Sequence, residues 1–98
     1  MVKKIRWSPK AADNFEGICA FIGKNSEFYA SMFAKKINAI VTNIPLFPDS
    51  GRIVPEYQDS NLREKIFQNY RIVYRKKGQF IEIVTISHTA KQLNIEHT

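Results

Sequence analysis

The sequence predicts an α+β fold, with a helical hairpin on one face of an antiparallel sheet. Two segments whose apolar residues recur at helical spacing come first, and three segments in which apolar residues alternate follow them. Each helix then has an apolar stripe that needs a sheet face to cover it. The 98 residues are 44% hydrophobic, enough for one packed core. We therefore expect a single domain over residues 1–98 that begins with a short strand.

Residues 2–22 predict the first strand and the first helix. The stretch VKKIRW alternates loosely, which favours a short strand with Ile5 and Trp7 facing inward. Ser8 then has the side chain of a helix N-cap, and Pro9 occupies the first helical position, where its missing N–H costs nothing. The apolar residues that follow fall on one helical stripe: Ala11, Phe15, Ile18, Cys19 and Ile22.

A second helix follows a polar break at residues 23–26, where Asn25 or Ser26 provides its N-cap. Pro45 stops this helix, because proline cannot donate the backbone hydrogen bond that would continue it. The apolar stripe consists of Ala30, Phe33, Ile37, Ile40, Val41 and Ile44. Two amphipathic helices with so short a connection form an antiparallel hairpin.

The second half of the chain predicts three strands, at residues 61–67, 70–76 and 80–87. Residues 45–59, which precede them, hold three of the four prolines and are typical of an irregular crossing segment. The last two strands are joined at Lys77-Gly78, since glycine tolerates the positive φ of a tight turn.

The alternation within residues 70–76 assigns each side chain to one face of the sheet. Arg71 and Arg75 share a face, which we expect to be uncovered and open to solvent. Tyr70, Ile72 and Tyr74, which alternate with Arg71, Val73 and Arg75, face the helices. The predicted core comprises Ala11, Phe15, Ile18, Ile22, Phe33, Ile37, Ile40, Tyr70, Ile72 and Tyr74.

Positive charge is concentrated on the strands of the second half. The chain has 15 Lys and Arg against 9 Asp and Glu, a net charge of +6. Between residues 61 and 80 the one acidic residue is Glu64, and the basic ones are Arg63, Lys65, Arg71, Arg75, Lys76 and Lys77. A basic patch of this kind fits nucleic acid or an acidic protein partner, and ordinary solvated decoration of a strand is the alternative.

Composition excludes several classes of protein. The single cysteine, Cys19, leaves no intramolecular disulfide and fits a reducing compartment. No apolar run approaches the roughly 20 residues of a membrane span, and the basic N-terminus leads into a polar turn, unlike a signal peptide. Two histidines, one cysteine and no acidic cluster do not make a metal site. We expect a cytoplasmic protein with no metal, no cofactor and no membrane partner.

Four stretches, by their order and spacing, resemble the RelE/ParE superfamily of toxins: WSPKAADNF, FPDSGRIVPE, LREKIFQNYRIVY and IEIVTISHTAK. The resemblance covers the chain from Ile5 to Leu93. It implies the α+β fold described above and a role as the toxin of a type II toxin–antitoxin module. It also implies a cognate antitoxin partner, whose C-terminal segment, often acidic, wraps the toxin.

The superfamily divides by target. RelE-like members cut mRNA in the ribosomal decoding site without a metal, whereas ParE-like members act on DNA gyrase and are not nucleases. Cleavage by a ribose 2′-hydroxyl needs a base, cations on the phosphorane and an acid for the leaving oxygen. Growth inhibition by ribosome-dependent mRNA cleavage is our leading hypothesis, because of the basic, arginine-bearing sheet. Gyrase inhibition, and a non-toxic relative that only binds its antitoxin, are the alternatives.

The resemblance supplies the candidate catalytic residues. Arg71 matches the arginine of the RelE-like YR motif, and Lys91 falls where a second arginine is expected, which keeps the charge but not the bidentate geometry. The RelE-like lysine pair is absent, since its positions hold Leu62 and Glu64. Glu64 could act as a general base, and His88, at the end of the last strand, as an acid or base.

These candidates also have structural interpretations. Arg71 could pair with Glu64 or Glu82 across the sheet. His88 could be an ordinary hydrogen-bonded histidine, and His97 falls near the position of a C-terminal tyrosine in RelE-like toxins. The other basic residues of the patch are expected to bind RNA or another target: Arg63, Lys65, Arg75, Lys76 and Lys77.

Overall fold

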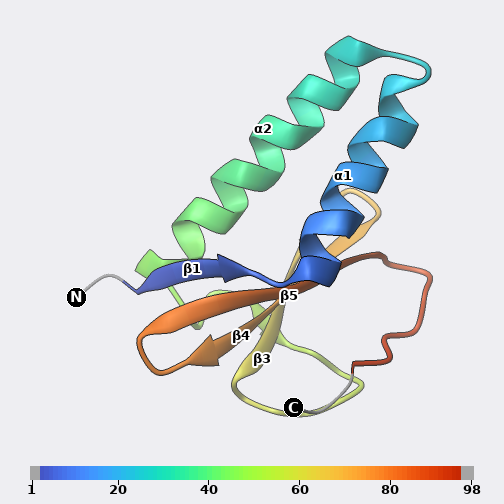
Figure 1. The fold of residues 1–98 in the computed structure, drawn as a ribbon. Helices are drawn as coiled ribbons and strands as arrows, with labels where there is room; N and C mark the ends of the chain where they lie inside the picture. Colours follow the sequence, from blue (N-terminus) through green and yellow to red (C-terminus); the bar gives the residue numbers. More distant parts are fainter. Residues whose placement is uncertain (1–2, 96–98) are drawn as a thin grey trace.

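Two helices stand on one face of a five-stranded sheet in the computed structural model, which describes residues 3–95 (Figure 1). This arrangement confirms the predicted α+β fold. The hairpin of the two helices rises from the sheet and extends beyond it (Figure 1). In chain order the elements are β1 (Lys4–Trp7), α1 (Pro9–Gly23), α2 (Glu27–Asn43), the 3₁₀ turn η1 (Ile44–Leu46), β2 (Arg52–Ile53), β3 (Leu62–Phe67), β4 (Tyr70–Lys77) and β5 (Phe80–His88).

The sheet is larger than the three-stranded one that the sequence predicts. The strand order is β1-β5-β4-β3-β2, in which β3, β4 and β5 form the predicted antiparallel set. β1 pairs in parallel with β5 at one edge, and β2 pairs antiparallel with β3 at the other. β2 has only two residues within the proline-rich segment, too few to show alternation. The turn between β4 and β5 has Gly78 at φ +48°, as its sequence predicts.

The helix starts follow the predicted capping chemistry. The Ser8 hydroxyl accepts a hydrogen bond from the Ala11 amide at 2.9 Å and donates one to the Val84 carbonyl at 2.8 Å. One side chain therefore caps α1 and fixes its start to β5. Ser26 caps α2 by accepting from the Tyr29 amide at 3.1 Å.

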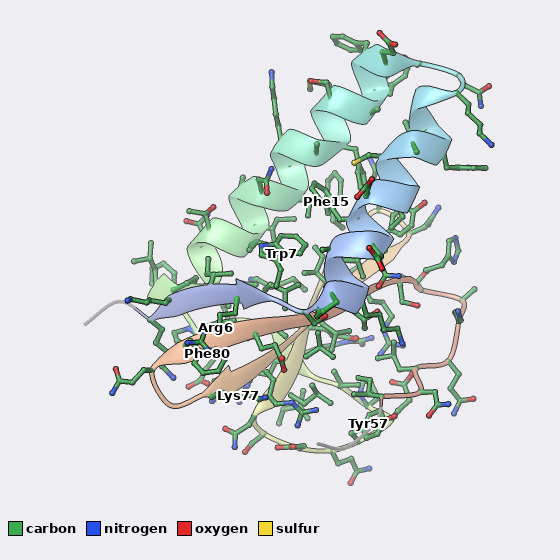
Figure 2. All side chains as sticks on the ribbon, viewed as in Figure 1. Arg6, Trp7, Phe15, Tyr57, Lys77 and Phe80 are labelled. Atoms are coloured by element: carbon green, nitrogen blue, oxygen red, sulfur yellow. The ribbon has the colours of Figure 1, made fainter. Side chains whose placement is uncertain are left out.

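The core lies between the helices and the sheet and contains every residue predicted for it. Ala11, Ile37 and Ile72 are fully buried there. The Trp7 and Phe15 rings pack 5.4 Å apart, and Figure 2 shows both between β1 and the helices. The remaining predicted members are Phe33 and Tyr74, which are buried, and Phe15, Ile18, Ile22, Ile40 and Tyr70, which are partly buried.

The opposite face of the sheet is covered over much of its length, so the expectation of an open face is wrong. A second apolar cluster lies there, with Tyr57 and Val84 packed against a buried set of Val54, Leu62, Val73, Leu93 and Ile95. These residues come from the proline-rich segment, from the strands and from the chain after β5. Leucine and valine on that face would otherwise expose apolar area to water, and the two irregular segments fold back to bury it.

Candidate functional site

Arg71 lies beneath this cover and not in solvent. It projects from β4 onto the second face, as the alternation predicts, but it is 5% exposed. Its strand neighbour Val73 belongs to the second apolar cluster, and Leu93 of the chain after β5 packs in the same cluster. An arginine in such surroundings must have its charge and its donors satisfied by the protein.

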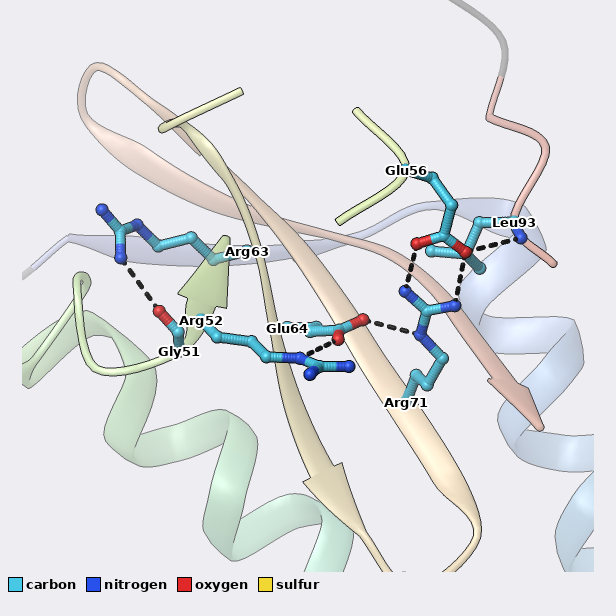
Figure 3. Close-up of polar contacts among 7 residues, drawn as sticks. All are labelled: Gly51, Arg52, Glu56, Arg63, Glu64, Arg71 and Leu93. Carbon is cyan, nitrogen blue, oxygen red and sulfur yellow. Dashed lines mark hydrogen bonds and ion pairs between the residues drawn. The ribbon is translucent and has the colours of Figure 1, made fainter. Parts of the chain in front are cut away.

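Arg71 belongs to a network of four charged side chains, with Glu56, Glu64 and Arg52 (Figure 3). Its Nε donates to Glu64 at 2.6 Å, and both terminal nitrogens donate to the Glu56 carboxylate at 2.7 Å, a bidentate pair. The far oxygen of Glu64 accepts from Arg52 Nε at 2.5 Å. Glu56 also accepts from the Leu93 amide at 3.2 Å, which ties the chain after β5 to this network.

The electrostatics of the network stabilise its charged form. Hydrogen bonds from Arg71 lower the pKa of Glu56 from 4.5 to about 2, against the opposing effect of burial. The hydrogen bonds that Arg71 donates to Glu56 and then to Glu64 raise the pKa of Arg71 above its ordinary value. Three of the five N–H groups of the guanidinium donate to carboxylates and the residue is 5% exposed, so little of Arg71 is accessible to a phosphate.

Glu64 is a bridging anion and is badly placed for the role of general base. Its side chain is fully buried on β3, diagonally across from Arg71 and directly opposite Arg52 of β2. The sequence suggested the pairing of Glu64 with Arg71 as a structural alternative, and the structure supports that alternative. It did not single out Glu56 or Arg52, because a carboxylate in an irregular segment and an arginine on a two-residue strand have no periodic signal.

Part of the predicted basic patch closes a loop instead of facing a target. Arg63 donates to the backbone carbonyls of Asp49 and Gly51, and the Lys76 ammonium pairs with the Asp49 carboxylate. The hydrogen bond from Lys76 lowers the pKa of Asp49. The Tyr74 hydroxyl donates to Pro48 and accepts from the Gly51 amide, so these side chains hold residues 48–51 against the sheet.

The rest of the patch is also largely compensated. Lys77 pairs with Glu82 at 3.4 Å, and Arg75 lies 4.0 Å from Asp59. Lys65, half-buried on β3, forms no ion pair within residues 3–95. The expected cationic surface therefore has far less free charge than the sequence suggests.

His88 and Lys91 lie apart from the Arg71 network. Both are exposed, and the Lys91 amide donates to the His88 carbonyl at 3.0 Å. The Nδ1 atom of His88 accepts from the Ala90 amide at 3.2 Å, and its ring contacts Tyr70 edge-on at 5.7 Å. Both line a groove of about 590 Å³ between α1 and the chain after β5, and Arg71 does not line it. His97 lies outside the described residues.

Residues 3–95 contain no group of three or more histidine, cysteine, aspartate or glutamate side chains placed to hold a metal ion. Within the same residues, neither helix is long and apolar enough to cross a membrane. The four catalytic candidates thus form two separate sets: a closed ionic network at Arg71 and Glu64, and an open groove at His88 and Lys91.

A family model and a solved structure both relate this chain to ParE toxins. The family model described as the ParE toxin of the type II toxin–antitoxin system parDE matches residues 5–93. A chain of the chromosomal ParDE toxin–antitoxin system from P. aeruginosa has the same fold, with a TM-score of 0.72 and 19% identity over 89% of this chain and 96% of that one. No curated protein matches the sequence. With nearly its whole length matched by the family model, the chain belongs to the ParE toxin family of type II toxin–antitoxin systems.

Proposed function

We propose that this chain is the growth-inhibiting toxin of its module, and that it acts in the cytoplasm by binding DNA gyrase without cutting RNA. Membership of the ParE family supports this target, because ParE-like toxins act on gyrase whereas RelE-like ones cut mRNA. This proposal replaces mRNA cleavage, the leading hypothesis from the sequence. The observation that carries it is the closed network at Arg71.

A RelE-like mechanism needs its catalytic groups around one phosphate. Arg71 is the residue that best matches the RelE-like pattern, yet all of its nitrogens bond to Glu56 and Glu64 and apolar residues cover it. Leu62, at one of the two lysine positions, is buried in the same cover. His88 and Lys91 line a groove that does not include Arg71. This division of the groups disfavours general acid–base cleavage.

An antitoxin partner follows from membership of a toxin–antitoxin family. The exposed apolar side chains of the helical hairpin are Phe21, Phe28, Tyr29 and Met32, and they supply area that such a partner can bury. An antitoxin expressed from a neighbouring gene should therefore relieve the growth inhibition.

Inducible expression in a bacterial host tests the proposal. Growth arrest, a reporter of DNA damage and the rate of protein synthesis are followed together after induction, and the purified chain is added to a gyrase supercoiling assay. We expect DNA damage to precede any fall in protein synthesis, and supercoiling to be inhibited. Ile37→Asp is the control, because a charge at a fully buried core position unfolds the chain and removes its effects.

Three results separate the alternatives. An immediate stop of protein synthesis, with cuts in ribosome-bound mRNA, would establish the RelE-like mechanism and exclude the proposal. Growth that continues unchanged at high expression of folded chain, with supercoiling unaffected, would leave a non-toxic antitoxin-binding relative. If Ile37→Asp inhibits supercoiling as strongly as the wild type does, the inhibition does not require the folded toxin and is non-specific.

A further inference from the structure

Two grooves adjoin each other around the start of α1. The first, of about 590 Å³, lies between α1 and the chain after β5, and its lining includes His88 and Lys91. The second, of about 630 Å³, lies at the start of α1, and its lining includes Ser8, Arg75 and Glu82. The two grooves adjoin, because their linings share Lys10, Asn94 and Ile95, and we call the adjoining pair the path.

Positive charge follows this path. Lys10 stands where the grooves meet, Lys91 lies in the first and Arg75 in the second. The one acidic side chain in either lining is Glu82, whose carboxylate is engaged by Lys77 at 3.4 Å. Lys10 and Lys91 are both exposed, and neither makes an ion pair within residues 3–95. Lys10 and Lys91 are therefore free cations within the described residues, in contrast to Arg75, which lies 4.0 Å from Asp59.

The uncharged groups of the first groove add an aromatic wall and neutral polar side chains. The half-buried Tyr70 ring and the exposed His88 ring meet edge-on at 5.7 Å. Ser87 and Gln92 line the same groove and can hydrogen-bond uncharged polar groups of a ligand. Spaced cations beside an aromatic surface are the combination that proteins use for single strands of nucleic acid, whose phosphates and bases alternate.

We propose that these adjoining grooves bind a single strand of nucleic acid, with Lys10 and Lys91 on its phosphates and the Tyr70–His88 pair beside a base. An acidic polypeptide is the less suitable ligand, since it offers charge but no flat rings for the aromatic wall. A recessed path also suits one strand better than a rigid duplex. The proposal goes beyond gyrase inhibition and does not depend on it, because strand binding can be measured without any toxic effect.

Fluorescence anisotropy with labelled 15-nucleotide DNA and RNA strands tests this, using the full chain over a series of salt concentrations. Lys10→Glu/Lys91→Glu should bind at least about tenfold more weakly. The negative slope of log K against log salt should become shallower by about 1.4, which is about 0.7 for each lost phosphate contact. His88→Ala should weaken binding by about fivefold with the slope unchanged, because stacking involves no counterions.

Lys35→Glu/Lys36→Glu is the matched control. It changes the net charge by the same amount, and both lysines are exposed on α2 and outside either groove. We expect it to weaken binding less than threefold. Thermal melts verify the fold, which glutamate at position 10 should tolerate because an acidic side chain suits the first turn of a helix.

Three outcomes would overturn the proposal. One is the absence of measurable binding by the folded wild type. Another is an equal loss in the groove variant and the matched control, which would make the binding a general effect of charge. The third is displacement of the strand by poly-glutamate at equal charge concentration, with the same dependence on Lys10 and Lys91, which would assign the path to an acidic protein.

Discussion

Arg71→Ala should destabilise the fold by about 3 to 5 kcal/mol, the usual cost of removing one partner from a buried ion pair. This loss of stability is large for a single substitution on a strand, because two carboxylates lose their partner. The Glu64 side chain is fully buried and would retain only Arg52, whose own side chain is 61% exposed. Glu56 would lose both hydrogen bonds of its bidentate pair.

Equilibrium unfolding in urea measures this loss, and Arg75→Ala provides the matched control. Arg75 lies on the same strand and face, and its side chain is 21% exposed. Within residues 3–95 it makes one ion pair, to Asp59 at 4.0 Å, so its removal should cost less than about 1 kcal/mol. If Arg71→Ala were as mild as Arg75→Ala, the network would not stabilise the fold. If Arg71→Ala fails to fold, Arg71→Lys, which keeps the charge but not the bidentate pair, should show an intermediate loss.

Two further predictions concern stability. The pKa of Glu56 is depressed from 4.5 to about 2, so its contribution should be complete above about pH 4.5 and lost as the pH falls towards 2. After allowance for solvent screening, we expect Glu56→Gln to lower the free energy of unfolding by about 1 to 2 kcal/mol at pH 7, and this difference from wild type to vanish at pH 2. A difference that does not depend on pH would contradict the assignment. Gly51→Ala should cost more than about 2 kcal/mol in a thermal melt, because its Cβ would lie 2.7 Å from both the Glu64 carbonyl and the Tyr74 hydroxyl. Gly17→Ala, with nothing within 4 Å of its Cβ, should instead stabilise α1 by up to about 1 kcal/mol, and equal melting of the two variants would refute the difference.

Local chemistry made most of the fold predictable. Ser8 and Pro9 define the start of α1, and Gly78 defines the last turn, because each acts through its own backbone or its near neighbours. Alternation correctly placed Arg71 and Arg75 on one face. It could not predict what covers that face, because Val54 and Leu93 come from segments with no period and reach the sheet only through tertiary folding.

The candidate site was less predictable for the same reason. Matching to a family gives positions along the chain, but it does not give the contacts of each side chain. Arg71 fits the RelE-like arginine by position, yet Glu56, 15 residues away along the chain, accepts a hydrogen bond from each of its terminal nitrogens. His88 and Lys91 were grouped with Arg71 by role, and the fold places them in a groove that Arg71 does not line.

The parallel pairing of β1 with β5 has a consequence for synthesis of the protein. The Ser8–Val84 hydrogen bond closes a loop of 76 residues, whose length-dependent entropy is on the order of 4 kcal/mol. A chain still emerging from the ribosome lacks β5 and has no partner for its first strand. The sheet can therefore be completed only after nearly the whole chain has been made. An antitoxin whose gene is translated first would already be present when the toxin reaches its folded form.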